Sequence, residues 1–373
     1  MTNIHIPIPL PVQPPRKPLA PPTPAEILAN RASSLYYAGR TADALPVAMQ
    51  AVETERTPHT LNNLVVILET LGRPDEAFPY AHAAYLLEPD DPRMARLYGE
   101  SLLRQGDLAR GWPIYARTHE PHWWLSPHVP EWRGESLADR RILVFAVDGY
   151  GDNIYFSRWL LDLADLGASV YYLAPPHLVP LARTLSPDIT VVPNYNGNFD
   201  LDLGMFDFHV DLHGIPQYLG VTYGGTPSRV PYFHVAPRPR FHLRRRTGFC
   251  WKAGEGRTSE GTSPWRTRSL NWDQRQRVLS KFPPSYIDLS SLTGSWLDTA
   301  QLIRSLDLLV TVDTGLAHLG GALGVPTWVM IPGASAWHYP AHLDRHPFYP
   351  SMRMFFNRGE GLNRAVSALV AAL

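Results

Sequence analysis

Residues 310–328 read VTVDTGLAHLGGALGVPTW, and this stretch decides the fold class of the second half of the chain. An apolar run stops at Asp313, a helical pattern of small residues follows, and a proline opens a second apolar run. Short apolar runs that are bounded by turn residues are typical of buried strands. The stretch therefore predicts a strand–helix–strand unit of a parallel sheet.

The turn of this unit is a candidate anion site. Its first helical residues, Thr314, Gly315 and Leu316, carry backbone N–H groups that have no partner within the helix, and the helix dipole is positive there. Gly315 lets a phosphate approach the backbone, and His318 lies one turn further along. These features favour a diphosphate as the ligand. The alternative is that Asp313 only caps the helix and that His318 packs in the core.

Similar units extend along the chain in both directions from this stretch. Apolar runs predict strands at 141–147, 168–174, 189–193, 207–212, 247–254, 285–290, 307–313 and 326–332, the last of which is expected to be the final strand. Helical patterns separate these runs, which implies parallel sheets with helices on both faces. A proline- and arginine-rich passage at 237–246 interrupts the rhythm, which then restarts. The region therefore predicts two Rossmann-like, doubly wound halves with a cleft between them.

The preceding part of the chain, residues 25–118, contains an internal repeat. The aligned segments are YYAGRTADAL (36–45), ETLGRPDEAF (69–78) and LRQGDLARGW (103–112). Gly39, Gly72 and Gly106 recur at intervals of 33 and 34 residues, each between two helical apolar patterns. This period, with glycine at the turn of a helix hairpin, is typical of tetratricopeptide repeats. Such repeats form either a docking groove or a helical cap on the next domain, and the sequence leaves both alternatives open.

Composition and charge exclude several function classes. The 373 residues include 34 basic and 34 acidic side chains, so no global field attracts nucleic acid or an anionic membrane. Cys250 is the single cysteine, which rules out a disulfide within the chain and fits a reducing compartment. Residues 1–24 contain nine prolines and predict an extended, disordered arm rather than a signal peptide. No run approaches the ~20 apolar residues of a membrane helix, so we expect a cytoplasmic protein.

Three further patterns have an ordinary structural interpretation. His119, His122 and His128 lack the spacing of a zinc site, so residues 119–139 predict an aromatic linker. Asp200–Leu201–Asp202 has the form of a metal-binding Asp-x-Asp motif, but it lies in a polar stretch that favours a surface loop. The arginine run at 238–246 favours an interdomain linker over an RNA-binding segment.

The segment DTGLAHLGGALGVPTWVMIP (313–332) resembles the donor-site motif of glycosyltransferase family 9, the bacterial heptosyltransferase family. It is still more similar to the family-9-like domain of bacterial proteins that also carry tetratricopeptide repeats. VDGYGDNIYFSRWL (147–160) resembles the first loop of the family, and HPFYPSMRMFF (346–356) resembles its closing segment. The resemblance extends over residues 141–358.

This resemblance implies a GT-B fold and inversion at the anomeric carbon without a metal ion or other cofactor. The implied organisation is a disordered arm (1–24), tetratricopeptide repeats (25–125), an acceptor domain (126–240) and a nucleotide-sugar domain (241–373). Asp152 matches the proposed general base of the heptosyltransferases. The residues that match the donor-phosphate segment are Asp313, Thr314, Gly315, Leu316 and His318, and the additional basic residue is Lys252 or Arg268.

The physical requirements of the implied reaction agree with these assignments. A carboxylate near the acceptor can take the hydroxyl proton, and Asp152 follows the first predicted strand of the acceptor half. The alternative for Asp152 is a helix-capping role. The residues that we expect to contact the sugar or the acceptor are Gly151, Asn153, Trp337 and Tyr339, although core packing is an equally good interpretation of the two aromatic residues.

Two departures from the family put the donor in doubt. Asp148 stands where relatives more often have Glu or Gln, and the stretch 251–270 is longer and more basic than expected. The tetratricopeptide pairing makes UDP-N-acetylglucosamine a candidate donor beside ADP-heptose and GDP-sugars. We therefore expect a glycosyltransferase whose repeats recruit a protein or glycan acceptor. The alternatives are a catalytically degenerate interaction scaffold and an epimerase-like enzyme.

Overall fold

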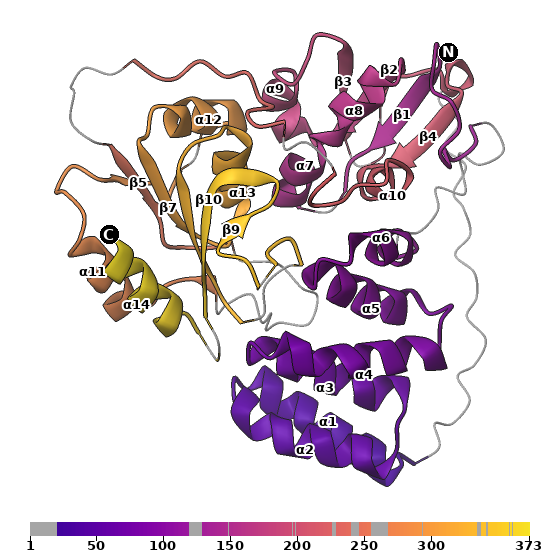
Figure 1. Ribbon diagram of the computed structural model, residues 1–373, viewed down its shortest axis with the longest axis vertical. Helices are drawn as coiled ribbons and strands as arrows, with labels where there is room; N and C mark the ends of the chain where they lie inside the picture. The colour runs from indigo at the N-terminus through magenta and orange to yellow at the C-terminus, as the bar shows by residue number, and fades with distance from the viewer. Residues whose placement is uncertain are drawn as a thin grey trace, which may run out of the picture.

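The chain forms a helical array that is joined to two α/β halves, as seen in the computed structural model in Figure 1. The structure describes residues 21–118, 129–147, 149–195, 197, 199–225, 229–239, 246–254, 268–292, 294–333, 337–340, 342–357, 359 and 361–373. The predictions for residues 1–20, for His119, His122 and His128, and for Asp148 lie outside the described residues.

The helical array consists of three antiparallel hairpins, which confirms the prediction of tetratricopeptide-like repeats. Its helices are α1 (Pro24–Tyr37), α2 (Thr41–Thr54), α3 (Pro58–Thr70), α4 (Pro74–Leu87), α5 (Pro92–Arg104) and α6 (Leu108–Ala116). Gly39, Gly72 and Gly106 lie in the turns with φ angles of +75°, +69° and +84°. Only glycine adopts this left-handed conformation without strain, which explains why the glycine recurs with the repeat.

Small residues and helix caps explain how the hairpins form. Thr23 caps α1 through a reciprocal pair of hydrogen bonds with Glu26, which satisfies two backbone groups at the helix start. Ala29, Ala44 and Ala77 are completely buried between the helices. Alanine has a high helix propensity and lets neighbouring helices pack closely, so these positions support both local structure and packing.

The first α/β half is a four-stranded parallel sheet in the order β3-β2-β1-β4. Its strands are β1 (Arg141–Phe145), β2 (Ser169–Ala174), β3 (Ile189–Pro193) and β4 (Phe208–Asp211). Its α-helices are α7 (Tyr150–Phe156), α8 (Trp159–Asp165), α9 (Val179–Ala182) and α10 (Ile215–Tyr218). Its short 3₁₀ turns are η1 (Pro176–Leu178), η2 (Leu203–Met205) and η3 (Leu212–Gly214). One face packs on α7 and α8. The other face packs on Val129 and on the segment around Phe206 rather than on a long helix.

The second half is a six-stranded sheet in the order β6-β5-β7-β8-β10-β9. Its strands are β5 (Thr247–Cys250), β6 (Ile287–Asp288), β7 (Leu308–Val312), β8 (Thr327–Ile331), β9 (Arg345–His346) and β10 (Tyr349–Phe356). Its helices are α11 (Trp272–Leu279), α12 (Trp296–Arg304), α13 (Gly315–Ala322) and α14 (Asn363–Ala372). Leu308 and Val310 pack with α11 and α14, whereas Leu309 packs with α12 and α13. Helices therefore cover both faces, as the alternation of strands and helices predicts.

The prediction that 326–332 is the final strand is wrong. β10 follows it, pairs in parallel with β8 and carries β9 as an antiparallel edge. The sequence of β10 contains Pro350, Ser351 and Arg353, which interrupt the apolar run that marks the other buried strands. Its buried side chains, Tyr349, Met352 and Met354, complete the core beside α13.

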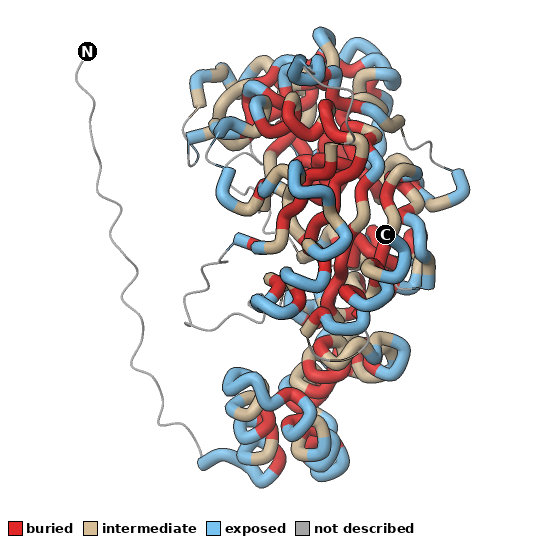
Figure 2. Tube along the Cα trace, turned by 90° about the vertical axis from the view of Figure 1, so that its left-hand side faces the viewer, coloured by how far each residue is buried: buried red, intermediate tan, exposed pale blue. Residues whose placement is uncertain are grey.

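The last repeat hairpin shares the core of the α/β halves. Trp112 of α6 contacts the rings of Trp159 and Trp337, and its Nε1–H donates to the carbonyl of Val221 over 3.1 Å. Leu103 and Leu108 of the same hairpin belong to this core too. Figure 2 shows the buried segments running from the α/β halves down toward the array. This packing matches the helical-cap alternative for the repeats.

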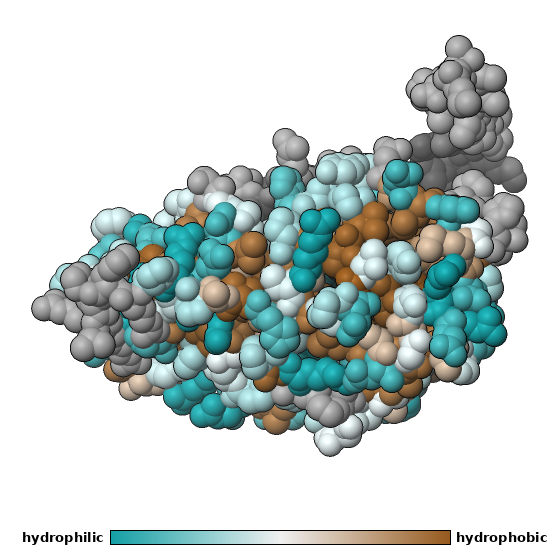
Figure 3. All heavy atoms as spheres, turned by 90° about the horizontal axis from the view of Figure 1, so that it is seen from above, coloured by the Kyte–Doolittle hydropathy of each residue, from teal (hydrophilic) through white to brown (hydrophobic). Residues whose placement is uncertain are grey.

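The surface carries no uniform apolar face in the view from above the α/β halves. Polar and apolar residues lie side by side over much of this face (Figure 3). In the part of the chain that the structure describes, no helix combines the length and the apolar character that spanning a bilayer requires.

The crossing of α5 and α6 depends on Gly99, and we predict that Gly99→Ala destabilises the protein. An added Cβ would lie 2.9 Å from the backbone nitrogen of Tyr115, which cannot move without shifting α6. We expect a loss of about 1–3 kcal/mol in the free energy of unfolding, despite the better helix propensity of alanine. Urea unfolding measures the change.

Gly111→Ala is the matched control. There the added Cβ would meet the Leu103 side chain, at 2.7 Å from Cδ2 and 2.8 Å from Cγ, and the nearest backbone atom, the Leu103 nitrogen, only at 3.2 Å. We expect the smaller loss in this variant. A Gly99→Ala protein as stable as wild type would contradict the close crossing of α5 and α6.

Candidate active site

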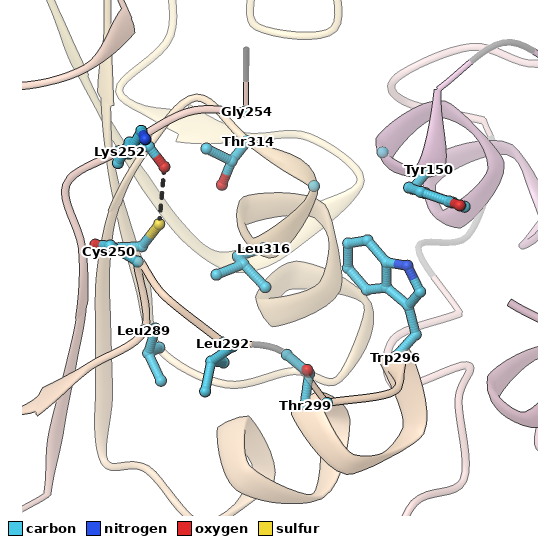
Figure 4. A pocket seen from close by; sticks show the side chains of 14 residues that line it. Tyr150, Cys250, Lys252, Gly254, Leu289, Leu292, Trp296, Thr299, Thr314 and Leu316 are labelled. Carbon is cyan, nitrogen blue, oxygen red and sulfur yellow. Dashed lines mark hydrogen bonds between the residues drawn. The ribbon is translucent and has the colours of Figure 1, made fainter. Parts of the chain in front are cut away.

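A pocket of about 420 Å³ lies between the two α/β halves. It sits at the carboxyl ends of β5, β6 and β7, which is where parallel sheets bind ligands. The residues that line it are Tyr150, Gly151, Cys250, Lys252, Gly254, Leu289, Ser290, Leu292, Gly294, Trp296, Thr299, Thr314, Gly315 and Leu316 (Figure 4). Five of the residues predicted from the sequence, namely Gly151, Lys252, Thr314, Gly315 and Leu316, are among them.

The starts of α7 and α13 meet beside this pocket, one from each half. A Cβ added to Gly151 would lie 3.4 Å from Gly315 Cα and 3.2 Å from His318 Cδ2. A Cβ added to Gly315 would lie 2.9 Å from the Trp296 ring. Glycine at both positions therefore permits backbone contact between the two helix starts. Their unpaired N–H groups and positive dipole ends make this part of the cleft favourable for an anion.

The two ends of the pocket differ in chemistry. Lys252 and Thr314 lie at one end, and the rings of Trp296 and Tyr150 lie at the other (Figure 4). The two ring centroids are 5.4 Å apart, although Tyr150 belongs to the first half and Trp296 to the second. Cys250 is buried, and its thiol contacts the Lys252 carbonyl at 3.3 Å. The arrangement suits a ligand with an anionic portion and a flat apolar portion.

Asp313 does not cap α13, and it does not line the pocket. The helix begins after Thr314, which makes no side-chain capping bond. Asp313 is buried, its carboxylate is 3.5 Å from an Arg268 guanidinium nitrogen, and it accepts a hydrogen bond from Tyr339. Arg268 and Asp313 therefore form a polar pair beneath the helix start. Contact of these two residues with the donor phosphates, which the family resemblance implies, stays a prediction.

His318 is also enclosed by protein, and its contact with a phosphate stays a prediction. The ring is 4% exposed and packs against Tyr155, His338 and Tyr339. Burial lowers the pKa of this imidazole well below its ordinary value, and the neighbouring charge of His338 acts in the same direction. A neutral, buried ring cannot supply positive charge to a diphosphate. It supports the contact between α7 and α13 instead.

Asp152 lies in the first turn of α7 without capping it. The N-cap is Gly149, and no side-chain capping bond is present. The Asp152 side chain is one-third exposed (33%), and its Oδ1 is 3.2 Å from His338 Nε2. Burial alone would raise its pKa, but the hydrogen bond and charge of His338, with smaller effects of His213 and His318, hold the pKa well below its usual range. Asp152 is therefore an ionised, partly exposed carboxylate that follows Gly151 of the pocket lining, although Asp152 itself does not line the pocket.

Three of the four expected sugar-contact residues are buried in the structure. The Asn153 side chain holds the loop before α7 by bonding the backbone of Val147 and Gly149. Trp337 packs against Trp112, and Tyr339 packs against His318. Protein occupies the surfaces of Asn153, Trp337 and Tyr339 in this structure, and their contact with a sugar or an acceptor stays a prediction. Gly151 alone of the four lines the pocket.

A buried arginine joins the two halves behind the site. Arg158 follows α7, and its guanidinium donates to the carbonyls of Tyr155 and Phe348, each over 2.9 Å. Its Cζ lies 4.3 Å from the Tyr349 ring centroid and 4.6 Å from that of Tyr155. Carbonyl oxygens and aromatic faces stabilise this cation in the interior. Because Phe348 and Tyr349 belong to the second half, the arginine fixes the relation of the halves.

Sequence reasoning did not find several residues of the site. Tyr150, Cys250, Leu289, Ser290, Leu292, Trp296 and Thr299 line the pocket, and His338 contacts Asp152. Tyr150 lies two residues before Asp152, and Trp296 begins α12 beside a Ser295 cap, so both follow a strand or open a helix. The rule that ligands bind at the carboxyl ends of strands could have selected them. The His338 contact depends on tertiary packing and has no local signal.

The remaining predictions concern metal ligands. Asp202 accepts a hydrogen bond from the backbone of Gly204, so it caps the short turn η2 in a surface segment. Among the residues that the structure describes, no three or more His, Cys, Asp or Glu side chains gather in a group that could hold a metal ion.

Comparisons with known proteins give a limited set of similarities. No protein-family model matches the sequence. Protein FlbA of Caulobacter vibrioides is 23% identical over 319 residues, which cover 70% of this chain and 51% of that protein. The chain thus spans about half the length of this curated relative.

Solved structures with a similar arrangement include two bacterial enzymes. The iron-containing dodecameric glycosyltransferase TibC from enterotoxigenic E. coli is 12% identical, with 54% of this chain and 61% of that chain covered and a TM-score of 0.40. E. coli heptosyltransferase WaaC with ADP is 12% identical, with 62% and 98% covered and a TM-score of 0.40.

We predict that Gly151→Ala destabilises the protein because it separates the starts of α7 and α13. The added methyl group would press on the buried His318 ring and on the backbone of Gly315. Overpacking of this kind costs about 1–3 kcal/mol. The midpoint of thermal unfolding measures the effect.

Gly224→Ala serves as the matched control, because an added Cβ there would meet nothing within 4 Å. Its melting temperature should equal that of wild type. Equal melting temperatures for Gly151→Ala and Gly224→Ala would be incompatible with direct contact between the two helix starts.

Proposed function

We propose that this chain is a glycosyltransferase that moves a sugar from a nucleotide-sugar to a hydroxyl acceptor, with inversion and without a metal ion. The observation that carries the proposal is the pocket, where the start of α13 and Lys252 meet the turn that bears Asp152. The resemblance of residues 147–160 and 313–332 to glycosyltransferase family 9 supports the same reaction. The boundaries 126–240 and 241–373 remain the proposed acceptor and donor domains.

Asp152 has the properties that a general base needs in this reaction. It is ionised, it is partly exposed, and it lies at the start of a helix that contacts the donor half. The acceptor O–H proton passes to the carboxylate while the acceptor oxygen forms a bond to the anomeric carbon. Attack from the face opposite the diphosphate inverts the configuration there.

The start of α13 and Lys252 act on the leaving group. The bond between the anomeric carbon and the diphosphate oxygen breaks, and its electron pair leaves with the nucleoside diphosphate. The N–H groups of Gly315 and Leu316, together with the Lys252 ammonium, stabilise this growing negative charge. The rings of Trp296 and Tyr150 offer flat surfaces to the nucleoside or the sugar. Arg268 acts through Asp313 in this proposal, by supporting the helix start.

The donor and acceptor are assigned here only by class. The solved heptosyltransferase structures include one in complex with ADP-D-beta-D-heptose, which places ADP and its sugars among the first probes. UDP-N-acetylglucosamine and GDP-sugars complete the set. We propose that the repeats lie near the acceptor, which is a protein or a glycan, and that the protein works in the cytoplasm.

We predict that one nucleotide family raises the melting temperature. A ligand at 100 times its dissociation constant stabilises by about 2.7 kcal/mol. Lys252→Gln should weaken this binding about tenfold or more, because a charged hydrogen bond to the diphosphate contributes about 1.5–3 kcal/mol. A thermal-shift series with UDP, GDP, ADP and their sugars on wild type and variant measures both effects.

Lys281→Gln is the matched control, since Lys281 is also exposed but lies in the turn after α11. It should bind as wild type does. If no nucleotide shifts the melting temperature of the folded wild type, the alternative of a degenerate repeat scaffold replaces the transferase. Binding without any transfer to an acceptor would favour the epimerase-like alternative.

Asp152→Asn should abolish transfer while nucleotide binding remains. The amide has the shape of the carboxylate but cannot take the acceptor proton, so the rate should fall by about 10²–10⁴. Release of nucleoside diphosphate, measured with the donor identified by thermal shift, follows the reaction. Asp188→Asn, at an exposed position before β3, is the control. A wild-type rate in Asp152→Asn would refute the role of Asp152 as base.

A further inference from the structure

His338 lies behind Asp152 as seen from the cleft. Its ring is 4% exposed, and its Nε2 is 3.2 Å from Asp152 Oδ1. The Asp152 side chain, in contrast, is one-third exposed. In this pair the carboxylate is partly exposed, one residue after Gly151 of the pocket lining, and the imidazole lies in the protein interior.

Aromatic neighbours fix the His338 ring in this orientation. The Trp337 ring stacks on it with a centroid distance of 4.0 Å and an interplanar angle of 27°. The Tyr155 ring meets it edge-on at 4.6 Å, and the His318 ring lies 5.1 Å away. Because rings enclose the imidazole from several directions, its Nε2 keeps its place 3.2 Å from Oδ1 of Asp152.

The last helix of the repeat array holds Trp337 in turn. The Trp112 and Tyr115 rings of α6 lie 5.2 and 5.4 Å from the Trp337 ring. Tyr115 and Trp337 are also joined by a side-chain hydrogen bond. The indole N–H is the donor of this bond, and the phenol oxygen accepts it. A continuous set of contacts thus runs from α6 through Trp337 and His338 to Asp152.

We propose that His338 is a positioning residue for Asp152 and that α6 of the repeat array braces it. The inference rests on the proposed transferase function. In this proposal the imidazole, whose Nε2 lies 3.2 Å from Oδ1, limits the rotamers of the carboxylate, so that Oδ2 is left for the acceptor hydroxyl. The neighbour on the Oδ2 side is Gly149, where a Cβ would lie only 2.9 Å from this oxygen. The absence of a side chain at Gly149 therefore leaves Oδ2 accessible.

The proton balance of the step is simple. The acceptor proton moves to Oδ2, the acceptor oxygen bonds to the anomeric carbon, and the electron pair of the broken bond leaves on the diphosphate. His338 gains and loses no proton in this step, since it acts only on Oδ1. Its effect is on the geometry and on the basicity of the carboxylate.

Several ionisable groups face Asp152 from the elements packed around α7. They are His338 and Tyr339 after β8, His318 of α13, His213 of η3, Tyr115 of α6, and more distantly Arg158 and His346. Burial raises the pKa of Asp152, and the hydrogen bond with His338 is the largest effect that lowers it. Removal of the His338 ring should therefore raise the pKa of Asp152, because burial is then less opposed.

The first test needs no enzymatic activity. The full chain is labelled with ¹³C at the aspartate carboxyl groups, the Asp152 resonance is identified by its loss in Asp152→Asn, and its titration is followed by NMR. Wild type should titrate below the ordinary aspartate range of about 3.5–4. His338→Ala should titrate above it. His338→Gln should lie between the two, because its amide keeps a hydrogen-bond donor but not the imidazole ring. The exposed His234→Gln should match wild type.

The second test uses the transfer assay. His338→Ala should lower kcat about 10- to 100-fold, since a misplaced base loses its alignment with the acceptor. The donor KM should change little, because His338 does not line the pocket. The acid limb of the kcat profile should move to higher pH. His338→Gln should recover most of kcat, and Tyr115→Phe should show a smaller loss than His338→Ala.

The outcomes separate the two proposals. An Asp152 titration that is identical in wild type and a folded His338→Ala overturns the positioning role, whatever the activity. A shifted titration in a protein that binds no nucleotide and transfers no sugar refutes the proposed function and, with it, the catalytic meaning of the pair. If His338→Ala does not fold, the comparison of His338→Gln with wild type decides, and an unshifted titration there overturns the role.

Discussion

The backbone contact between Gly151 and Gly315 is the constraint on which the site depends. Each glycine opens a helix in a different half of the α/β region. A Cβ at Gly151 would lie 3.2 Å from the His318 ring, and a Cβ at Gly315 would meet the Trp296 ring at 2.9 Å. The contact brings two positive helix ends together, which is unfavourable in the absence of an anion. It also buries His318 and directs the turn bearing Asp152 toward the second half. The pocket, the proposed base and the proposed anion site therefore have one common geometric origin.

Arg158 stabilises this contact between the two α/β halves. A guanidinium in the interior carries a large desolvation cost, and a charge of the opposite sign is the usual compensation. Here carbonyl oxygens from both halves and the faces of Tyr155 and Tyr349 surround it. Since these partners come from α7 and from β10, the arginine is satisfied only while the halves keep their relation. The cleft is thus preorganised, which suits electrostatic stabilisation of a leaving group.

Much of the fold could be predicted because its signals are local. Apolar runs between turn residues identified the strands β1–β8, and the period of Gly39, Gly72 and Gly106 identified the hairpins. β10 was not predicted, because Pro350 and Arg353 interrupt its apolar run and because its buried and exposed residues do not alternate regularly. Within the site, Lys252 and Thr314 follow from the rule for strand ends. Contacts such as that of His338 with Asp152 join segments far apart in sequence, and no local pattern encodes them.

The packing of α6 against the α/β halves argues against an independent docking role for the helical array. A separate docking module would be joined by a linker and would leave the core of the enzyme unchanged. Instead, Trp112 and Tyr115 are buried against Trp337, and the turn at Gly72 lies against the backbone of Gly333 after β8. A partner that shifts the last hairpin must therefore act on the segment that carries His338. By thermodynamic reciprocity, a ligand that orders the cleft must change the affinity of the array for that partner to the same extent.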